Sequence, residues 1–227
     1  DGIPLRIDIE ASAVRDMAGN LHPETLDFGV TSIVDSVDPV LQSSLLNYST
    51  GDFIITVSEY VDATPAFEKV DLSKMYLSNA GVLTSIGGGN YNINPDDGFR
   101  INLAGATATQ VDGVLFTVRL LESQRAALQY MASTPGGDKD GPVVFDLLEG
   151  ALFDMAGRAV KSTQELSVTE IADTKPPTIT SVAVHVGTGV ITVNASEHID
   201  VSSIDLTKLF LSNTPGGHEV SLAGTGT

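Results

Sequence analysis

Eight carboxylate side chains recur in two sets of four, and carboxylates are the side chains that calcium sites in proteins use most. Each member of the first set has a counterpart 138 positions later. The pairs are Asp16 with Asp154, Asp35 with Asp173, Glu59 with Glu197, and Asp62 with Asp200. A calcium ion binds about six to eight oxygen atoms, so several of these groups would have to converge to hold one ion. The sequence therefore makes Ca²⁺ the candidate cofactor.

The places of these carboxylates along the chain allow two interpretations. The first pair lies in a glycine-containing turn, the second in a linker, and the last two pairs at the end of a predicted strand. A metal site would form where the turn and the linker approach the strand end of the next unit. The alternative is a set of ordinary turn and cap residues on an acidic surface, because Asp accepts hydrogen bonds from backbone N–H groups of its own turn.

The spacing of the carboxylates belongs to a longer internal repeat. The sequence DMAGN at 16–20 returns as DMAGR at 154–158 with the same offset of 138. The offset falls to 134 where VDLSKMYLSN at 70–79 matches IDLTKLFLSN at 204–213, and to 119 further along. These steps indicate a short insertion near ATPAFEK at 63–69 and a longer, glycine-rich insertion at 80–99. Insertions of this composition belong in surface loops.

A fixed period of this length is the signature of a repeat architecture. The sequence divides into the C-terminal part of one repeat at 1–36, a complete repeat at 37–174 and the N-terminal part of a third at 175–227. We therefore expect a segment of a longer repetitive polypeptide, or a chain whose partial repeats complete one another between molecules. On either view the partners are neighbouring repeats or other copies of the chain, which favours a homopolymer.

The composition excludes several classes of protein. Acidic residues outnumber basic ones by 29 to 12, which gives a net charge of −17 and argues against nucleic acid as a partner, because its phosphates are bound by Lys and Arg. Cysteine is absent, so the chain has neither disulfides nor a thiolate metal site. No run of apolar residues reaches the roughly 18 that a membrane span needs. These features are compatible with an extracellular setting.

Strand patterns dominate the sequence. Alternating β-branched runs at 178–186 and 190–196 flank the turn GTG and predict a hairpin. Seven strands are predicted in the complete repeat, at 40–48, 53–58, 74–79, 99–105, 113–120, 142–150 and 165–172. The segment 121–133 predicts a short helix with Ser123 as its N-cap. The fold class expected is all-β, a tandem of β-sandwiches with one short helix per unit.

Three motifs in a fixed order carry a resemblance to a known family. They are the linker ADTKPPTITSV at 172–182, the segment SEHIDVSSIDLTKLFLSN at 196–213 with its earlier twin, and the late DMAG turn. The whole chain resembles bacterial immunoglobulin-like repeats of S-layer proteins and adhesins, and is similar to repeats of algal and protist surface filaments. The resemblance implies immunoglobulin-like sandwiches joined end to end for reach, stiffness and attachment. The chain departs from the pattern at 80–99 and at Asp38, which replaces one linker proline.

Two N-glycosylation sequons are present, at Asn47 and Asn194. They do not occupy equivalent positions of the repeat, and about this number is expected by chance in a chain rich in Ser and Thr. Both residues are predicted near a turn or on the outer face of a strand. They are candidate glycan sites in a eukaryotic host and polar surface otherwise.

No arrangement of residues indicates catalysis. The four histidines form no metal-binding spacing, and there is no phosphate-binding loop and no nucleophile motif. We therefore expect a non-catalytic structural segment, not an enzyme, that builds a filament, stalk or surface layer at the cell surface. The alternative is an adhesin repeat that binds a surface ligand through variable loops such as 80–99, since binding loops often ride on rigid scaffolds.

Overall fold

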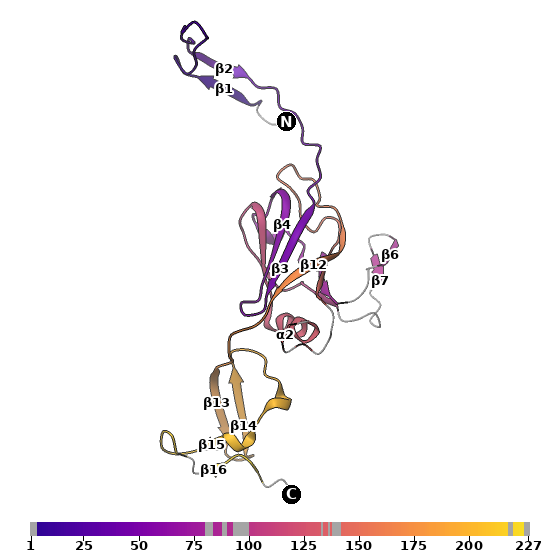
Figure 1. The fold of residues 1–227 in the computed structure, drawn as a ribbon, viewed down its shortest axis with the longest axis vertical. Coiled ribbons are helices and arrows are strands. Elements are labelled where there is room, and N and C mark those ends of the chain that lie inside the picture. The colour runs from indigo at the N-terminus through magenta and orange to yellow at the C-terminus, as the bar shows by residue number, and fades with distance from the viewer. Residues whose placement is uncertain are drawn as a thin grey trace. The chain divides into compact units, whose positions relative to one another are not determined.

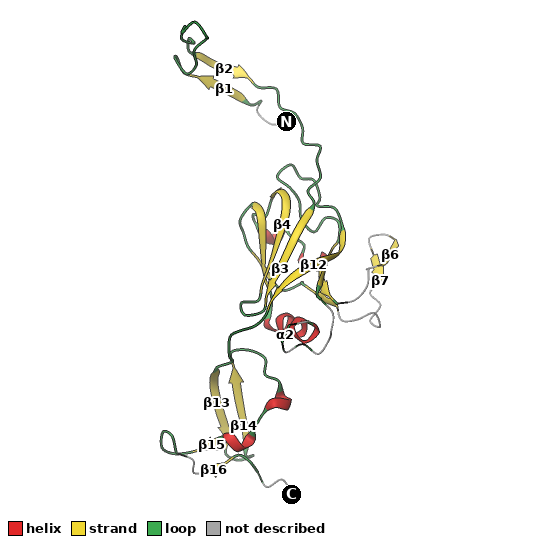
Figure 2. Ribbon diagram, in the orientation of Figure 1, coloured by secondary structure: helices red, strands yellow, loops and turns green. Residues whose placement is uncertain are grey.

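The computed structural model of the chain describes residues 4–79, 84–87, 90–92, 100–132, 134, 135, 137, 142–217 and 220–224. The chain divides into two compact units, Asp1–Val37 and Asp38–Thr227 (Figure 1). Strands are the main regular elements of both units and the helices are short (Figure 2). The predicted all-β character is confirmed at this level. No described helix is long and apolar enough to span a bilayer.

The first unit is a single β-hairpin. Strand β1 (Arg6–Ile9) pairs antiparallel with β2 (Thr25–Gly29), and Ile7 lies opposite Phe28. The loop between the strands contains the DMAGN turn. Both strands expose most of their residues, including Ile7 and Phe28, so the hairpin has no core of its own among the described residues.

The second unit is built on a large mixed sheet with the strand order β8-β5-β11-β12-β3-β4-β10-β9. All neighbours in this sheet are antiparallel except β12 and β3, which run parallel. The strands are β3 (Leu41–Asn47), β4 (Asp52–Val61), β5 (Met75–Ser78), β8 (Arg100–Asn102), β9 (Thr107–Ala108), β10 (Gly113–Arg119), β11 (Val144–Leu147) and β12 (Thr163–Ile171). Each strand predicted between residues 40 and 172 therefore has a counterpart.

The large sheet curls so that its two halves face each other across an apolar core. Phe53 on β4 meets Phe145 on β11 edge to face, with ring centroids 4.8 Å apart. Side chains from both halves are fully buried, and among the largest are Tyr48, Phe53, Phe116, Phe145, Leu46, Ile55, Met75 and Leu77. The alternation along β4 produces this core, because every second residue from Phe53 to Val57 is buried.

One helix of more than one turn covers an end of this core. Helix α2 (Glu122–Met131) buries Leu128 and Met131 against the sheet, as its apolar spacing predicts. Its N-cap is Leu121, whose backbone N–H donates to the Gln124 side chain at 2.9 Å. The prediction that Ser123 caps the helix is wrong, because the glutamine at the third helical position satisfies the free N–H instead. In the described part of the chain, two single-turn elements precede it, α1 (Ala66–Lys69) and the 3₁₀ helix η1 (Leu72–Lys74).

After β12 the chain forms a second hairpin and a short irregular segment. Strands β13 (Ile179–His185) and β14 (Val190–Ala195) pair antiparallel around the GTG turn, which confirms the predicted hairpin. The remaining elements are the 3₁₀ helices η3 (Val201–Ser203) and η4 (Leu206–Lys208) and the strands β15 (Phe210–Leu211) and β16 (Val220–Ser221). Every residue of β13 is exposed.

The local structure recurs at the offsets of the sequence. Strands β1 and β11 begin and end 138 residues apart, and so do β3 and β13. The left-handed backbone at Asp27, with φ of 58°, returns at Glu165 with φ of 55°. Such a conformation is uncommon outside glycine, so its return marks the same local backbone path.

The insertion at 80–99 lies largely outside the described residues. The backbone is described for β6 (Thr84–Gly87) and β7 (Asn90–Asn92), which pair antiparallel.

Candidate functional site

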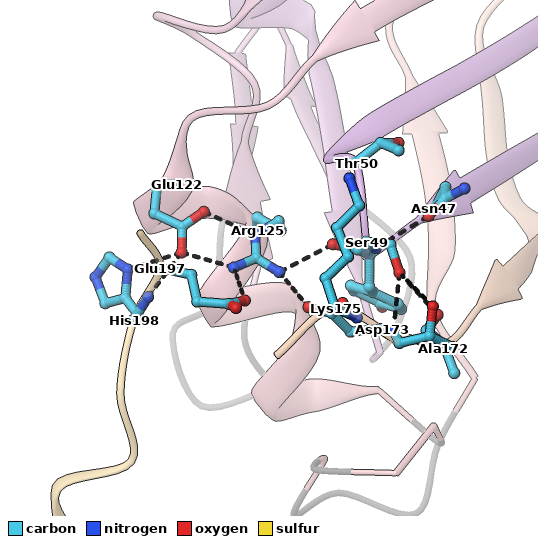
Figure 3. A network of polar contacts seen from close by, with 12 residues as sticks. Asn47, Ser49, Thr50, Glu122, Arg125, Ala172, Asp173, Lys175, Glu197 and His198 are labelled. Atoms are coloured by element: carbon cyan, nitrogen blue, oxygen red, sulfur yellow. Dashed lines mark hydrogen bonds and ion pairs between the residues drawn. The ribbon is translucent and has the colours of Figure 1, made fainter. Parts of the chain in front are cut away.

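The site with the densest set of charged contacts centres on Arg125, which is only 7% exposed on helix α2 (Figure 3). Its Nε and Nη2 donate to the two carboxylate oxygens of Glu122, each at 2.7 Å. Its Nη1 donates to Asp173 Oδ2 at 2.6 Å and to the carbonyl of Tyr48 at 2.9 Å. Its Nη2 also donates to Glu197 Oε2 at 2.9 Å. One guanidinium therefore joins the helix, the turn after β3, the linker after β12 and the start of the segment after β14.

The linker is held by further bonds beside the arginine. Asp173 Oδ1 accepts the backbone N–H of Lys175 at 2.9 Å, and Ser49 Oγ accepts the backbone N–H of Thr174 at 2.8 Å. The Ser49 hydroxyl also lies 3.5 Å from the carbonyl of Ala172 (Figure 3). The turn between β3 and β4 thus receives the linker directly.

Glu122 also binds the segment after β14, through His198. Glu122 Oε1 accepts the backbone N–H of His198 at 2.9 Å, and His198 Nδ1 lies 3.2 Å from the same oxygen. Ion pairing with Arg125, together with the bonds from His198, lowers the pKa of Glu122 to about 2. Glu122 therefore stays ionised through the range in which ordinary glutamates titrate.

The cluster holds more negative than positive charge. Arg125 faces three carboxylates, those of Glu122, Asp173 and Glu197. Its pKa is raised by the bonds to Glu122, against an opposing effect of burial. Burial would raise the pKa of Asp173, but the N–H of Lys175 and the guanidinium of Arg125 outweigh it and lower that pKa. The arginine is thus the central cation on which the arrangement depends.

The eight recurring carboxylates fall into four situations in the structure. Asp173 and Glu197 are brought together, but by a guanidinium. Asp62 pairs with Lys69 at 2.8 Å. Asp16, Asp35 and Asp200 each accept backbone N–H groups within their own turns. Asp16, Asp35 and Asp200 thus stand in turns, as the turn and cap interpretation expects. Asp62, Asp173 and Glu197 form ion pairs that neither interpretation named.

Glu59 and Asp154 form the remaining situation. Their carboxylate oxygens lie within 4.8 Å of one another. Asp154 is 2% exposed, and its Oδ1 accepts the backbone N–H groups of Ala156 and Arg158. Its Oδ2 is buried and has no hydrogen-bond partner among the described residues. A buried, unsatisfied carboxylate oxygen beside a second carboxylate is a favourable place for a cation.

One exchange between the repeats explains the unsatisfied oxygen. In the first copy of the turn, Asp16 Oδ2 accepts the side-chain amide of Asn20 at 2.8 Å. Arg158 replaces this asparagine in the second copy. The Arg158 guanidinium pairs with Asp38 instead, so Asp154 loses the donor that Asp16 retains.

The two sequons lie in different surroundings. Asn47 is half-buried at the end of β3, and its Oδ1 accepts the backbone N–H of Ser49 at 3.0 Å. Asn194 is exposed on β14, and its Nδ2 donates to Ser181 Oγ at 2.7 Å. Of the two, Asn194 is the more accessible.

Sequence reasoning did not single out Arg125. The available signal was the Glu122–Arg125 spacing of three, which places both side chains on one helix face. The distant partners at 173 and 197 follow only from the tertiary structure.

Comparisons with known proteins identify no relative of this chain. No protein-family model, no curated protein and no solved structure matches the chain. The resemblance to bacterial immunoglobulin-like repeats therefore stays a prediction from the motifs.

Proposed function

We propose that the chain is a non-catalytic structural segment of an extracellular surface polypeptide. In this proposal immunoglobulin-like β-sandwich repeats follow one another and build a filament, stalk or surface layer. The recurrence of local structure at the sequence offsets supports the tandem arrangement. The facing halves of the curled sheet, in contact through Phe53 and Phe145, support the sandwich.

The observation that carries the proposal is the Arg125 cluster, which ties a linker and the hairpin segment after it to the preceding repeat. Moving that segment away would leave Asp173 and Glu197 without their counter-charge, although their side chains are only 9% and 15% exposed. Leaving buried charges unpaired is costly. Pro176 and Pro177 also fix two successive φ angles in the linker. A junction with these properties resists bending, as a stiff rod requires.

Stiffness at the junction can be measured directly. The chain has no cysteine, so spin labels at the exposed positions Ser43→Cys and Thr192→Cys report a single distance. We expect a narrow distance distribution in pulsed EPR that broadens with Arg125→Leu and stays narrow with Arg119→Leu. Arg119 is the matched control because it pairs with Asp52 at 2.8 Å but keeps 58% of its side chain exposed. Distance distributions of equal width in the doubly labelled protein and in its Arg125→Leu and Arg119→Leu variants would contradict the stiff junction.

The assembled state needs a test on the native material. Negative-stain electron microscopy of the polypeptide that contains this chain is expected to show ordered fibres or sheets. Isolated, flexible beads would refute the structural role.

A second proposal concerns Ca²⁺ at Glu59 and Asp154. The unsatisfied Oδ2 of Asp154 favours it, because hard cations take carboxylate oxygens together with backbone oxygens and water. Isothermal titration with Ca²⁺ tests it. Asp154→Asn keeps an acceptor for the turn and removes the charge, so we expect binding to be lost. The matched change Asp16→Asn lies in the other copy of the turn and is expected to leave binding unchanged. Heat release that survives Asp154→Asn would exclude this site.

A further inference from the structure

A groove with apolar walls lies beside β9, the last strand at one edge of the large sheet. One wall is formed by α1 and η1, and the other by the segment 104–110. Its volume is about 360 Å³, whereas roughly 150 Å³ is enough to hold a benzene molecule. Most of the lining side chains are apolar, and they include Ala66, Val70, Leu72, Ala104, Ala106 and Ala108. The groove can therefore hold an aromatic side chain.

Phe67 stands on the rim of the same groove. It is 79% exposed, which makes it the most exposed aromatic side chain among the described residues. A protruding phenyl ring beside an apolar groove makes a surface that fits itself. Two copies related by a two-fold axis can each place the ring in the groove of the other, and the two rings then contact each other.

The neighbouring repeat does not cover this position. The sequence offset of 134 pairs Val70 with Ile204. Three residues before each of them stands an exposed apolar residue, Phe67 in one repeat and Val201, which is 77% exposed, in the next. The junction with the central repeat binds His198, only three residues before Val201, and still leaves Val201 exposed. End-to-end packing therefore leaves the position open to a lateral partner.

The walls of the groove carry no net charge, although the whole chain has a charge of −17. Segment 66–74 contains two acidic and two basic residues, and segment 104–110 contains neither kind. Two copies of so acidic a chain repel each other, so they approach best where the local charge cancels. A basic partner would gain more from the acidic remainder of the surface than from this neutral groove. The charge pattern therefore favours a second copy as the occupant.

We propose that the groove is a lateral contact between two copies of this chain, related by a two-fold axis. Phe67 of each copy lies in the groove of the other, against Ala104, Ala106 and Ala108. This inference rests on the proposed structural role and adds the surface through which neighbouring polypeptides pack side by side. In a polymer the contact recurs with the repeat, so contacts that are weak one at a time add up.

Sedimentation equilibrium of the chain measures this contact. We expect a reversible monomer–dimer equilibrium, because an isologous contact closes at two copies. Phe67→Ser removes both phenyl rings from the dimer and should weaken association at least about tenfold. Met155→Ser is the matched control, because Met155 is 60% exposed in the DMAG turn and does not line the groove; it should leave the dissociation constant unchanged. Both positions are exposed, so the urea midpoints should stay near that of the wild type.

A second variant tests the groove separately from the ring. Ala104 is exposed, and Ala104→Gln fills the groove with a polar side chain, so it should weaken association as strongly as Phe67→Ser. Mixing the two variants restores one of the two contacts, because Phe67 of the Ala104→Gln protein can enter the open groove of the Phe67→Ser protein. With a fluorescent label on one variant, sedimentation should show more mixed dimer than either variant forms alone.

Three results would overturn the contact. They are a monomer at every concentration, a dissociation constant that Phe67→Ser leaves unchanged, and the absence of any gain on mixing the two variants. The first would assign the groove to a different partner. A chain that stays monomeric but shows the narrow EPR distance at the Arg125 junction would overturn this inference alone and leave the proposed function standing.

Discussion

Replacing Arg125 by leucine tests whether the charged cluster contributes to the free energy of unfolding of the protein. The change removes five hydrogen bonds, two to Glu122 and one each to Tyr48, Asp173 and Glu197. It leaves three carboxylates facing one another without a cation. Removing one partner of a buried ion pair costs about 3–5 kcal/mol. Because Glu122 keeps 38% of its side chain exposed, we expect the lower end, about 3 kcal/mol.

Urea unfolding followed by far-UV circular dichroism measures this loss. With a slope of about 2 kcal/mol per molar urea, the midpoint should fall by roughly 1.5 M. Arg119→Leu removes an exposed ion pair and should cost no more than about 0.5 kcal/mol. A second comparison isolates the pairing itself: Glu197→Gln should destabilise the wild type and relieve the Arg125→Leu protein.

Two results would refute this reasoning. The first is a midpoint for Arg125→Leu that matches that of Arg119→Leu. The second is an effect of Glu197→Gln that is the same with and without Arg125, since coupled residues give non-additive changes.

Three further predictions concern pH and backbone geometry. The pKa of Glu122 is lowered to about 2, so its contribution is complete above pH 4.5 and is lost between there and pH 2; the EPR distribution should broaden over that range and recover on return to neutral pH. Burial raises the pKa of Asp146, so its protonated form favours the fold, and the stability of the wild type relative to Asp146→Asn should fall as the pH rises above the ordinary aspartate pKa of about 3.9. Gly51 has φ of +72°, so Gly51→Ala should cost about 1 kcal/mol in urea unfolding, whereas Gly113→Ala, at an ordinary φ, should be neutral or slightly stabilising.

Strand positions were accessible from the sequence because local patterns determine them. The alternation in β4 and the turn between β13 and β14 are properties of a few consecutive residues, and both predictions agree with the structure. The helix was equally visible, but its N-cap was not. Gln124 also donates to the carbonyls of Asn102 and Ala104, which are distant in sequence. These tertiary contacts hold the Gln124 side chain where it accepts the N–H of Leu121, and so they favour Leu121 as the N-cap.

The candidate site was accessible only in part. The repeat drew attention to Asp173 and Glu197, and these two residues do meet. Their partner, Arg125, belongs to α2. The segments that match each other in the sequence do not include this helix, so the repeat offers no second copy of Arg125 for comparison. Asp38 was noted only as a missing proline, yet it accepts ion pairs from Arg158 and Lys161. Partners more than 100 residues away leave no local pattern.

The parallel pairing of β3 and β12 has a mechanical consequence. The central repeat begins just before β3 and ends just after β12, so a pulling force along the polypeptide enters and leaves at opposite ends of these two neighbouring strands. The hydrogen bonds between them lie across the direction of pull and are loaded together instead of one after another. Rupture then requires the whole ladder from Ser44 to Asn47, with the bond from Tyr48 N–H to the carbonyl of Ile171, to fail at once. A repeat with this strand order resists unfolding best when force is applied between its two ends.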